Sequence, residues 1–330
     1  MMKKKYIYAC ILSYCILLTI ILIVGTLKQN TNFSGKSIQS ALLNQKYTNI
    51  INKIKFEIPI EDSQYSASVE FFKKNIDGNE YWQGTTGNIS FNINKKVMKD
   101  FLDIFSSTQD FIHLSDDISY WEQFGLSLPN AVHITFYESV NGNDTIRSDL
   151  YFGKSTADYS GVYVRSGKNT SVYRIKNDFS TYLSPYVDFW ADLSVFQTES
   201  SNSLFQKESN VISVYINMND NEDSKKTMKI YDDGSNEYKS YIHTLLSVRG
   251  SEIVEHENAL SLGITKILEI QTTNQNMRSA FLTVYSTSIE TGLSARYFVQ
   301  FKTDKDESYP NYFIEISGWT YRNLLPSDFM

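Results

Sequence analysis

One segment resembles a nucleotide phosphate-binding loop but lacks the residues that its chemistry requires. Between Gly161 and Lys168 the glycines are separated by five residues instead of four, and Asn169 stands where a Ser or Thr hydroxyl would bind magnesium. The flanking residues alternate in the manner of a β-strand. We therefore predict a strand followed by a turn here, without a nucleotide site.

Two further segments begin like ion-binding motifs and then depart from them. Glu222 stands where a calcium-binding loop needs glycine, and Met228 where it needs a bidentate glutamate, although alternating asparagines precede them (Asn217, Asn219 and Asn221). The run from His256 to Leu260 starts like a zinc-protease helix and ends without the second histidine. Neither segment has a complete ligand set.

The remaining reactive side chains are few and scattered. Both cysteines, Cys10 and Cys15, lie in the first 24 residues, which excludes a disulfide framework, an iron–sulfur site and a Cys nucleophile in the rest of the chain. The paired acids (Asp116-Asp117 and Asp232-Asp233) adjoin turn residues, as solvated carboxylates do. We predict no catalytic residue, cofactor or metal, and hence no enzyme; a hydrolase with dispersed carboxylates stays open as the less favoured alternative.

Aromatic residues offer the better candidates for binding. The chain has 23 Tyr and 20 Phe, most of them in stretches that read as half-buried strands. Adjacent aromatic pairs mark a possible peptide- or glycan-binding face (Tyr81, Trp82, Tyr120 and Trp121). Arg165 and Arg174 fall on two strands of a predicted hairpin, where they would face each other, face an acidic group, or remain ordinary surface charges.

The amino-terminal segment predicts a membrane anchor. After Lys3, Lys4 and Lys5, residues 6–24 are 19 uncharged and mostly apolar positions, about the length that crosses the hydrocarbon core. The lysines predict a cytoplasmic amino terminus and a periplasmic or extracellular body, so residues 1–27 would be a signal anchor in the cell membrane. A cleaved signal peptide is the alternative. Residues 28–49 are polar and predict a tether.

The rest of the chain carries 28 basic and 37 acidic residues, a net charge of −9. A negative body argues against nucleic acid as a partner.

The body predicts two copies of one α+β unit. Apolar residues at helical spacing mark an amphipathic helix from Asn94 to Ser106, with Asn94 as its N-cap, and the same spacing returns in residues 236–247. Gly125 and Gly263 follow these helices and lie 138 residues apart. We predict two similar lobes, 50–196 and 211–330, each a mostly antiparallel sheet covered by a helix, with a linker at 197–210. Chance offsets are the alternative.

The order of landmarks in the first lobe resembles a bacterial family known as domain of unknown function 4340. They are a Trp in a short strand at Trp82, the helix, and then the segments 121–129, 149–154, 161–165 and 171–175. The second lobe departs from the pattern, because it has Lys266 or its neighbours in place of the turn proline.

The resemblance implies a membrane-anchored protein, often associated with ABC transporters of the gliding-motility-auxiliary type, and it supplies no catalytic residues. A transporter permease or auxiliary subunit is therefore the expected partner; an envelope glycan or peptidoglycan is the alternative ligand. Within the pattern we expect structural turns at Gly125, Pro129, Gly153 and Gly263.

Overall fold

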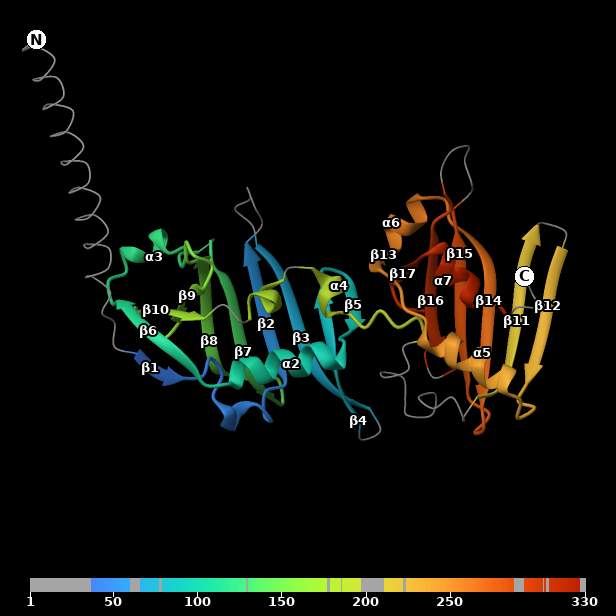
Figure 1. Ribbon diagram of the computed structural model, residues 1–330, viewed down its shortest axis with the longest axis horizontal. Helices are drawn as coiled ribbons and strands as arrows, with labels where there is room; N and C mark the ends of the chain where they lie inside the picture. Colours follow the sequence, from blue (N-terminus) through green and yellow to red (C-terminus); the bar gives the residue numbers. More distant parts are fainter. Residues whose placement is uncertain are drawn as a thin grey trace, which may run out of the picture.

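The computed structural model shows two antiparallel sheets, each crossed by one long helix (Figure 1). It describes residues 37–326 except 60–65, 77–78, 129, 177–178, 185, 197–210, 222–223, 288–293, 305 and 307–308. The predicted α+β architecture of mostly antiparallel strands with few helices is confirmed. The predicted anchor at 6–24 and the predicted linker at 197–210 lie outside the described residues. None of the helices within the described ranges has both the length and the apolarity of a membrane span.

The first lobe contains a sheet of ten described strands in the order β1-β6-β10-β9-β8-β7-β2-β3-β4-β5. The strands are β1 Ser37–Ser40, β2 Lys53–Pro59, β3 Ser66–Ile76, β4 Asn79–Thr86, β5 Ile89–Asn92, β6 Gln109–Ser115, β7 Val132–Val140, β8 Asn143–Ser155, β9 Gly161–Ser166 and β10 Val172–Lys176. Its helical elements are η1 Gln45–Tyr47, α2 Lys95–Ser106, α3 Tyr120–Gln123, η2 Ser180–Leu183 and α4 Val187–Trp190.

The second lobe contains a sheet of seven described strands in the order β12-β11-β14-β15-β16-β17-β13. The strands are β11 Val211–Asn221, β12 Ser224–Tyr231, β13 Glu252–Glu255, β14 Thr265–Asn274, β15 Ser279–Ser286, β16 Tyr297–Thr303 and β17 Tyr312–Ile316. Its helices are α5 Asn236–Ser247, α6 His256–Ser261 and α7 Gly318–Asn323.

The two sheets share one strand order. Without β1, β4 and β5, the first sheet reads β3-β2-β7-β8-β9-β10-β6, which matches the second sheet strand for strand in chain order. Helices α2 and α5 have 12 residues each. Along the chain, each comes directly before the last strand of this shared order, which is β6 in the first lobe and β13 in the second. An internal duplication predicts this pattern.

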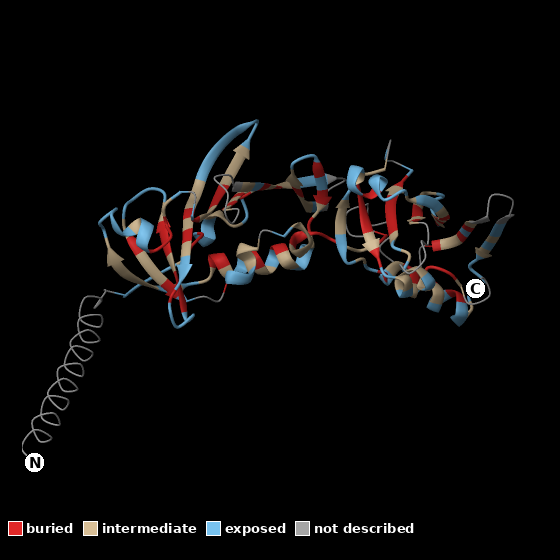
Figure 2. Cartoon of the chain, turned by 90° about the horizontal axis from the view of Figure 1, so that it is seen from above, coloured by how far each residue is buried: buried red, intermediate tan, exposed pale blue. Residues whose placement is uncertain are grey.

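The long helices bury one face each, as their periodicity predicts. The side chain of Asn94 accepts hydrogen bonds from the backbone N–H groups of Lys96 and Val97, so this residue is the predicted N-cap of α2. Met98, Phe101 and Phe105 are buried on the sheet side of that helix. Burial alternates with exposure along both long helices in Figure 2, so one face of each helix packs on its sheet and the other faces solvent.

Residues 37–49 correct the prediction of a tether that reaches residue 49. Strand β1 pairs with β6, Leu42 and Leu43 are buried, and the N–H of Leu43 donates to the carbonyl of Phe105 at 2.8 Å. Burial removes the apolar surface of these two adjacent leucines from water, which stabilises the packing of this segment on the lobe. The first lobe therefore begins at or before Ser37.

The lobes are in contact through the chain segment that follows α4. The N–H of Val195 donates to the carbonyl of Val248 at 2.9 Å, and Gly250 N–H donates to Leu193 at 2.8 Å. Asp188 accepts the N–H of Ile253 at 2.6 Å. Buried residues of both lobes belong to one continuous apolar cluster.

The turns at Gly125 and Gly263 have the backbone conformation that favours glycine, with φ of 70° and 67°. A Cβ at Gly125 would lie 2.8 Å from Cγ of Lys154 and 3.2 Å from its backbone nitrogen, whereas a Cβ at Gly263 would meet nothing within 4 Å. Gly153 is packed so closely that a Cβ would overlap the carbonyl oxygen of Phe124. Pro129 lies outside the described residues.

These two turns allow backbone strain to be separated from crowding. We expect Gly263→Ala to lower the free energy of unfolding by about 1 kcal/mol, because only the left-handed backbone is penalised. We expect Gly125→Ala to cost about 2 kcal/mol or more, because Lys154 must also move. Urea unfolding of both variants measures the difference. Equal losses would show that the contact with Lys154 is unimportant.

Candidate functional site

A row of polar side chains crosses the face of the first sheet opposite α2. Glu57 on β2 pairs with His133 on β7, His133 pairs with Tyr151 on β8, Tyr151 pairs with Arg165 on β9, and Arg165 pairs with Val172 on β10. In-register residues on neighbouring strands lie about 5 Å apart on one face. The strand pairing therefore brings together residues from five strands of the sheet.

His133 lies between two carboxylates. Its Nδ1 is 2.7 Å from Oε2 of Glu57, and its Nε2 is 2.6 Å from Oδ1 of Asp149. The hydroxyl of Thr135 also lies 3.1 Å from Nε2. These two contacts hold the ring of His133 between the two carboxylates.

The flat groups of the row form a continuous stack. The rings of His133 and Tyr151 are nearly parallel, with centroids 4.1 Å apart. The guanidinium carbon of Arg165 lies 3.6 Å from the Tyr151 ring centroid and 3.8 Å from the Trp121 ring centroid. Arg165 is 6% exposed, and its Nε donates to the carbonyl of Leu126 at 3.1 Å. Of the alternatives open for Arg165, the ordinary surface charge does not hold, because α3 and the turn after it cover the side chain.

Burial and charge shift the pKa values of this row. Burial raises the pKa of Glu57, but hydrogen bonds from Lys55 and His133 lower it by more, so the net shift is downward. Burial raises the pKa of Tyr151 and lowers the pKa of Arg165. Arg165 still carries its charge at neutral pH, because the ordinary pKa of a guanidinium is far above 7.

The row is built to hold segments together. Each charged group named above has a charged, aromatic or carbonyl partner within the row, and Trp121 adds a hydrogen bond from Nε1 to the carbonyl of Thr170 at 3.1 Å. Among the described residues, no group of three or more His, Cys, Asp or Glu could hold a metal ion. The stack therefore fastens the α3 segment to the sheet.

The other sequence candidates lie apart from this row. Trp82 is half-buried against the main core, and Tyr81 is half-buried on the opposite face of β4, with a pKa raised by burial and by the charge of Asp306. Tyr120 is exposed and stacks on Phe124. Strand β4 is six positions from β10 in the sheet, so these aromatics do not form one binding face. Arg174 is half-buried on β10 and pairs with Tyr163 rather than with Arg165.

One acidic pair lies on the second sheet. Glu252 and Glu315 face each other on β13 and β17, and Arg296 Nε donates to Glu315 at 2.9 Å. A hydrogen bond with Glu315, then burial, then the charge of Glu315 raise the pKa of Glu252. Arg296, the largest cause, lowers the pKa of Glu315. Carboxyl groups in hydrogen-bond contact are closer than the separation of about 5 Å or more that glycoside hydrolysis requires.

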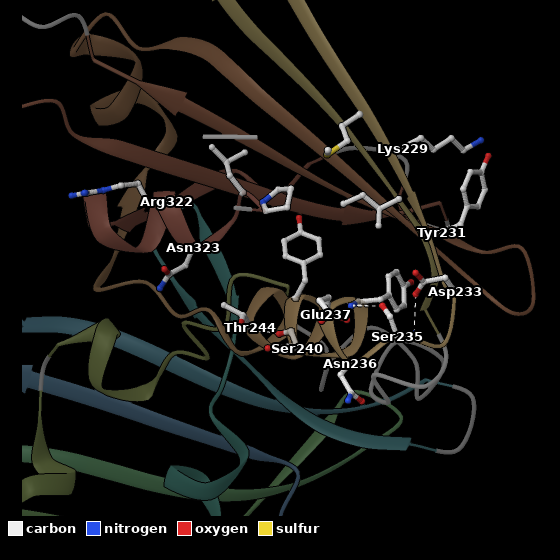
Figure 3. A pocket seen from close by; sticks show the side chains of 16 residues that line it. Lys229, Tyr231, Asp233, Ser235, Asn236, Glu237, Ser240, Thr244, Arg322 and Asn323 are labelled. Carbon is white, nitrogen blue, oxygen red and sulfur yellow. Dashed lines mark hydrogen bonds between the residues drawn. The ribbon is translucent and has the colours of Figure 1, made fainter. Parts of the chain in front are cut away.

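An open groove of about 950 Å³ lies in the second lobe (Figure 3). Its sides come from α5, from β12 and from α7 with the residues after it. The apolar part is formed by half-buried Met228 and Ile230 on β12, Tyr241 on α5, and Leu325 and Pro326 beyond α7. The labelled polar side chains in Figure 3 form its rim (Lys229, Tyr231, Asp233, Ser235, Asn236, Glu237, Ser240, Thr244, Arg322 and Asn323).

Two tyrosines fix α5 beside this groove. The Tyr241 hydroxyl donates to the carbonyl of Leu324 at 3.0 Å, and the Tyr238 hydroxyl donates to Val211 at 2.9 Å. Burial raises both pKa values, that of Tyr238 to about 12. Both hydroxyls are therefore protonated hydrogen-bond donors rather than bases at neutral pH.

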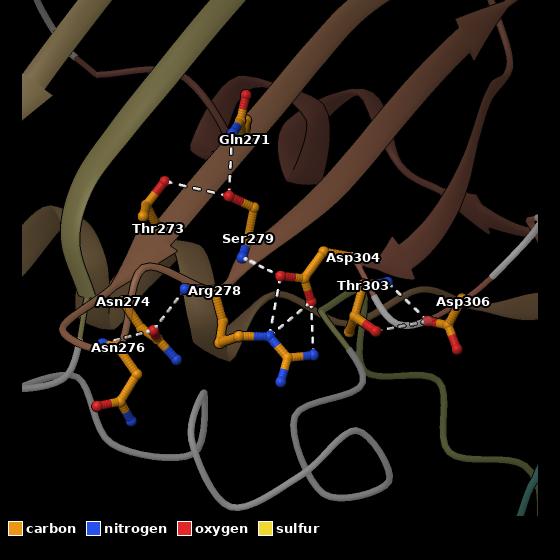
Figure 4. A network of polar contacts seen from close by, with 9 residues as sticks. All are labelled: Gln271, Thr273, Asn274, Asn276, Arg278, Ser279, Thr303, Asp304 and Asp306. Carbon is orange, nitrogen blue, oxygen red and sulfur yellow. Dashed lines mark hydrogen bonds and ion pairs between the residues drawn. The ribbon is translucent and has the colours of Figure 1, made fainter.

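A polar network closes one end of the second sheet (Figure 4). Nε of Arg278 lies 2.9 Å from Oδ2 of Asp304 and Nη2 lies 2.8 Å from Oδ1, while Ser279 N–H donates to the same carboxylate at 3.2 Å. Asn274 accepts two backbone N–H groups across the β14–β15 turn. These bonds join the turn to the end of β16, which is a structural role.

Sequence reasoning did not find the row or the groove. The row had a signal, since His133, Tyr151 and Arg165 occupy alternate positions of predicted strands, but the strand pairing that aligns them was not predicted. The groove had no such signal, because it depends on which segments of the fold cover β12 and α5, and no local pattern shows that.

A family model for a domain of unknown function, DUF4340, matches residues 93–262, which is just over half of the chain. The chain belongs to the DUF4340 family. The match runs from the start of α2 to the end of α6 and so includes parts of both lobes, whereas the sequence landmarks placed the resemblance in the first lobe.

A curated relative of this DUF4340 protein is an uncharacterized protein from Treponema pallidum (strain Nichols), 20% identical over 156 residues. The alignment covers 47% of this chain and 47% of that protein, so the chain spans about half the length of the relative it matches. No solved structure matches the DUF4340 chain.

The stacked guanidinium allows a specific test of the row. We expect Arg165→Lys to lower the free energy of unfolding by about 2 kcal/mol, because an ammonium keeps the charge but loses the planar contacts with Tyr151 and Trp121. Arg174→Lys on the neighbouring strand is the matched control, with an expected change within about 0.5 kcal/mol. Urea unfolding measures both. Similar losses would mean that the stack adds little stability.

The raised pKa of Glu252 predicts a pH-dependent effect. A group with a raised folded-state pKa contributes stability below its unfolded pKa and loses that contribution as pH rises through the folded pKa. Glu252→Gln removes the loss, so we expect the variant to be about 0.5 kcal/mol more stable than the native protein at pH 8 and equal to it at pH 4, after allowance for solvent screening. Glu257→Gln, on exposed α6, should show no such trend. A gain that is larger at pH 4 would contradict the assignment.

Proposed function

We propose that this DUF4340 protein is a non-catalytic binding or adaptor protein, and that the groove beside α5 is its binding surface. The observation that carries the proposal is the groove itself, which combines half-buried apolar side chains with a polar rim. Such a surface is typical of peptide and protein recognition. The charged row of the first lobe supports the same interpretation, because its groups bind one another.

The proposal places the protein in the cell membrane, with residues 6–24 as anchor and the lobes outside the cytoplasm. This part rests on the sequence of the segment and the lysines before it. Twelve residues separate Val24 from Ser37, and even a fully extended chain of that length reaches at most about 43 Å. Confinement near the bilayer raises the effective concentration for a membrane neighbour, so weak contacts are sufficient for association. We propose an ABC-type transporter complex as that neighbour, on the family resemblance.

A photo-crosslinker in the groove tests the proposal. Benzoylphenylalanine replaces Tyr231, an exposed residue of the rim, in the full-length protein in native membranes. We expect irradiation to give a discrete adduct with a membrane protein. Tyr159, an exposed residue of the first lobe, receives the same replacement as a control and should give no such adduct. Absence of any adduct at Tyr231, together with hydrolysis of a glycan or peptide by the purified protein, would overturn the binding function in favour of an enzyme.

A further inference from the structure

The groove of the second lobe corresponds to a position that is filled in the first lobe. Phe56 and Ile216 are equivalent: each is buried, faces the long helix, and pairs with a buried isoleucine on the next strand (Ile134 and Ile270). On the other side Phe56 pairs with Val69 and Ile216 pairs with Met228. Two residues after Val69 on β3 comes Phe71, and two residues after Met228 on β12 comes Ile230, so these two residues also correspond.

The equivalent residues differ sharply in burial. Val69 and Phe71 are 4% and 0% exposed, whereas Met228 and Ile230 are only half-buried and line the groove. The strand pairing is the same on the inner side of each pair, but on the outer side β3 has the further neighbours β4 and β5, whereas β12 is the edge strand of its described sheet. The segments that cover the two places differ as well.

In the first lobe an aromatic pair on α4 covers this place. The Trp190 ring centroid lies 4.9 Å from that of Phe71, 5.3 Å from Phe56 and 5.3 Å from Phe101 on α2. Phe189 packs edge-on against Trp190 at 5.1 Å, and Trp190 is 2% exposed. A single tryptophan thus joins the sheet to the long helix and seals the space between them.

The chain reaches both places in the same way. In the first lobe η2 ends at Leu183 and α4 follows after three residues; in the second lobe α7 leads to Leu324, Leu325 and Pro326, which border the groove. No described residue of the second lobe takes the place of Trp190. The groove therefore has the floor and walls of an aromatic-binding pocket, with Tyr241 in one wall and no described side chain in the place of Trp190.

We propose that the groove binds a segment of a partner protein that carries two adjacent aromatic side chains, in the position that Phe189 and Trp190 occupy in the first lobe. This inference rests on the proposed binding function and names the chemistry of the ligand. The larger aromatic ring packs on Met228 and Ile230 and against Tyr241 of α5. Backbone groups of the bound segment remain near the polar rim, which carries two cations (Lys229 and Arg322) and two carboxylates (Asp233 and Glu237).

A peptide with the chain's own sequence from Ser184 to Ala191 is the probe, because it contains the native aromatic pair. We measure binding of the fluorescently labelled peptide to the full-length protein in detergent by fluorescence anisotropy. We expect saturable binding that weakens at least about tenfold when the tryptophan of the peptide is replaced by alanine. Equal binding of the two peptides would overturn the aromatic specificity.

Two variants on one strand separate the groove from other surfaces. Met228→Glu places a charge in the apolar part of the groove and should weaken peptide binding about tenfold. Thr227→Glu, exposed on the other face of β12, should change binding less than about twofold. Circular dichroism checks that both variants keep the native strand content. Loss of binding in both variants, or in neither, would contradict the assignment to the groove.

Other occupants give distinct results. Residues 327–330 lie outside the described ranges, and peptide binding that appears only after their deletion would assign the groove to the chain's own last residues and overturn the proposal. A dimer that is lost in Met228→Glu by sedimentation velocity would assign it to a second copy, with the same consequence. A Tyr231 adduct in membranes without peptide binding in solution would refute the aromatic ligand and leave the adaptor function standing.

Discussion

The packing of Phe101 against the first sheet is the contact on which the architecture of this lobe depends. Its ring lies within 6 Å of the ring centroids of Phe56, Phe136 and Trp190, so one helix residue touches two strands and the segment after η2. Each of these aromatic residues is fully or nearly fully buried. Replacing a large buried aromatic residue by alanine lowers the free energy of unfolding by about 3–5 kcal/mol, because buried apolar surface is lost and a cavity is left behind. Helix α2, the central strands and α4 therefore stabilise one another.

The outer faces of the sheets show how the same framework tolerates different chemistry. The row that contains Glu57, His133 and Arg165 in the first sheet is ionic and stacked. The row at the matching register of the second sheet contains Asn217, Glu269, Thr283 and Gln300, with Asn217 paired to Glu269 and Thr283 paired to both Glu269 and Gln300. In that row Gln300 donates to the carbonyl of Pro310 and Thr283 contacts the Tyr309 hydroxyl at 2.7 Å. Each row thus fastens a covering segment, by stacking in one lobe and by neutral hydrogen bonds in the other.

Local features of the fold could be predicted from the sequence, and long-range features could not. Helix α2 and its cap followed from apolar spacing and from Asn94, because these depend on residues three or four positions apart. Strand β1 was missed because Ser37–Ser40 contains one apolar residue and its partner strand lies some 70 positions away. Arg165 was misjudged for a similar reason, since its burial depends on Trp121 and Leu126, which no local pattern connects to β9.

The contrast between the lobes also bears on why the groove would persist. Apolar surface left in water costs about 25 cal/mol per Å², so the half-buried Met228 and Ile230 contribute less stability to the second lobe than the buried Val69 and Phe71 contribute to the first. The first lobe shows that an aromatic residue in the place of Trp190 is compatible with this framework. A protein that spends stability on such a surface gains a site whose occupancy strengthens the fold, because any ligand that binds only the folded state stabilises it. On the proposed function, a partner bound in the groove would stabilise the second lobe, whereas the buried Trp190 already fills the equivalent place in the first lobe.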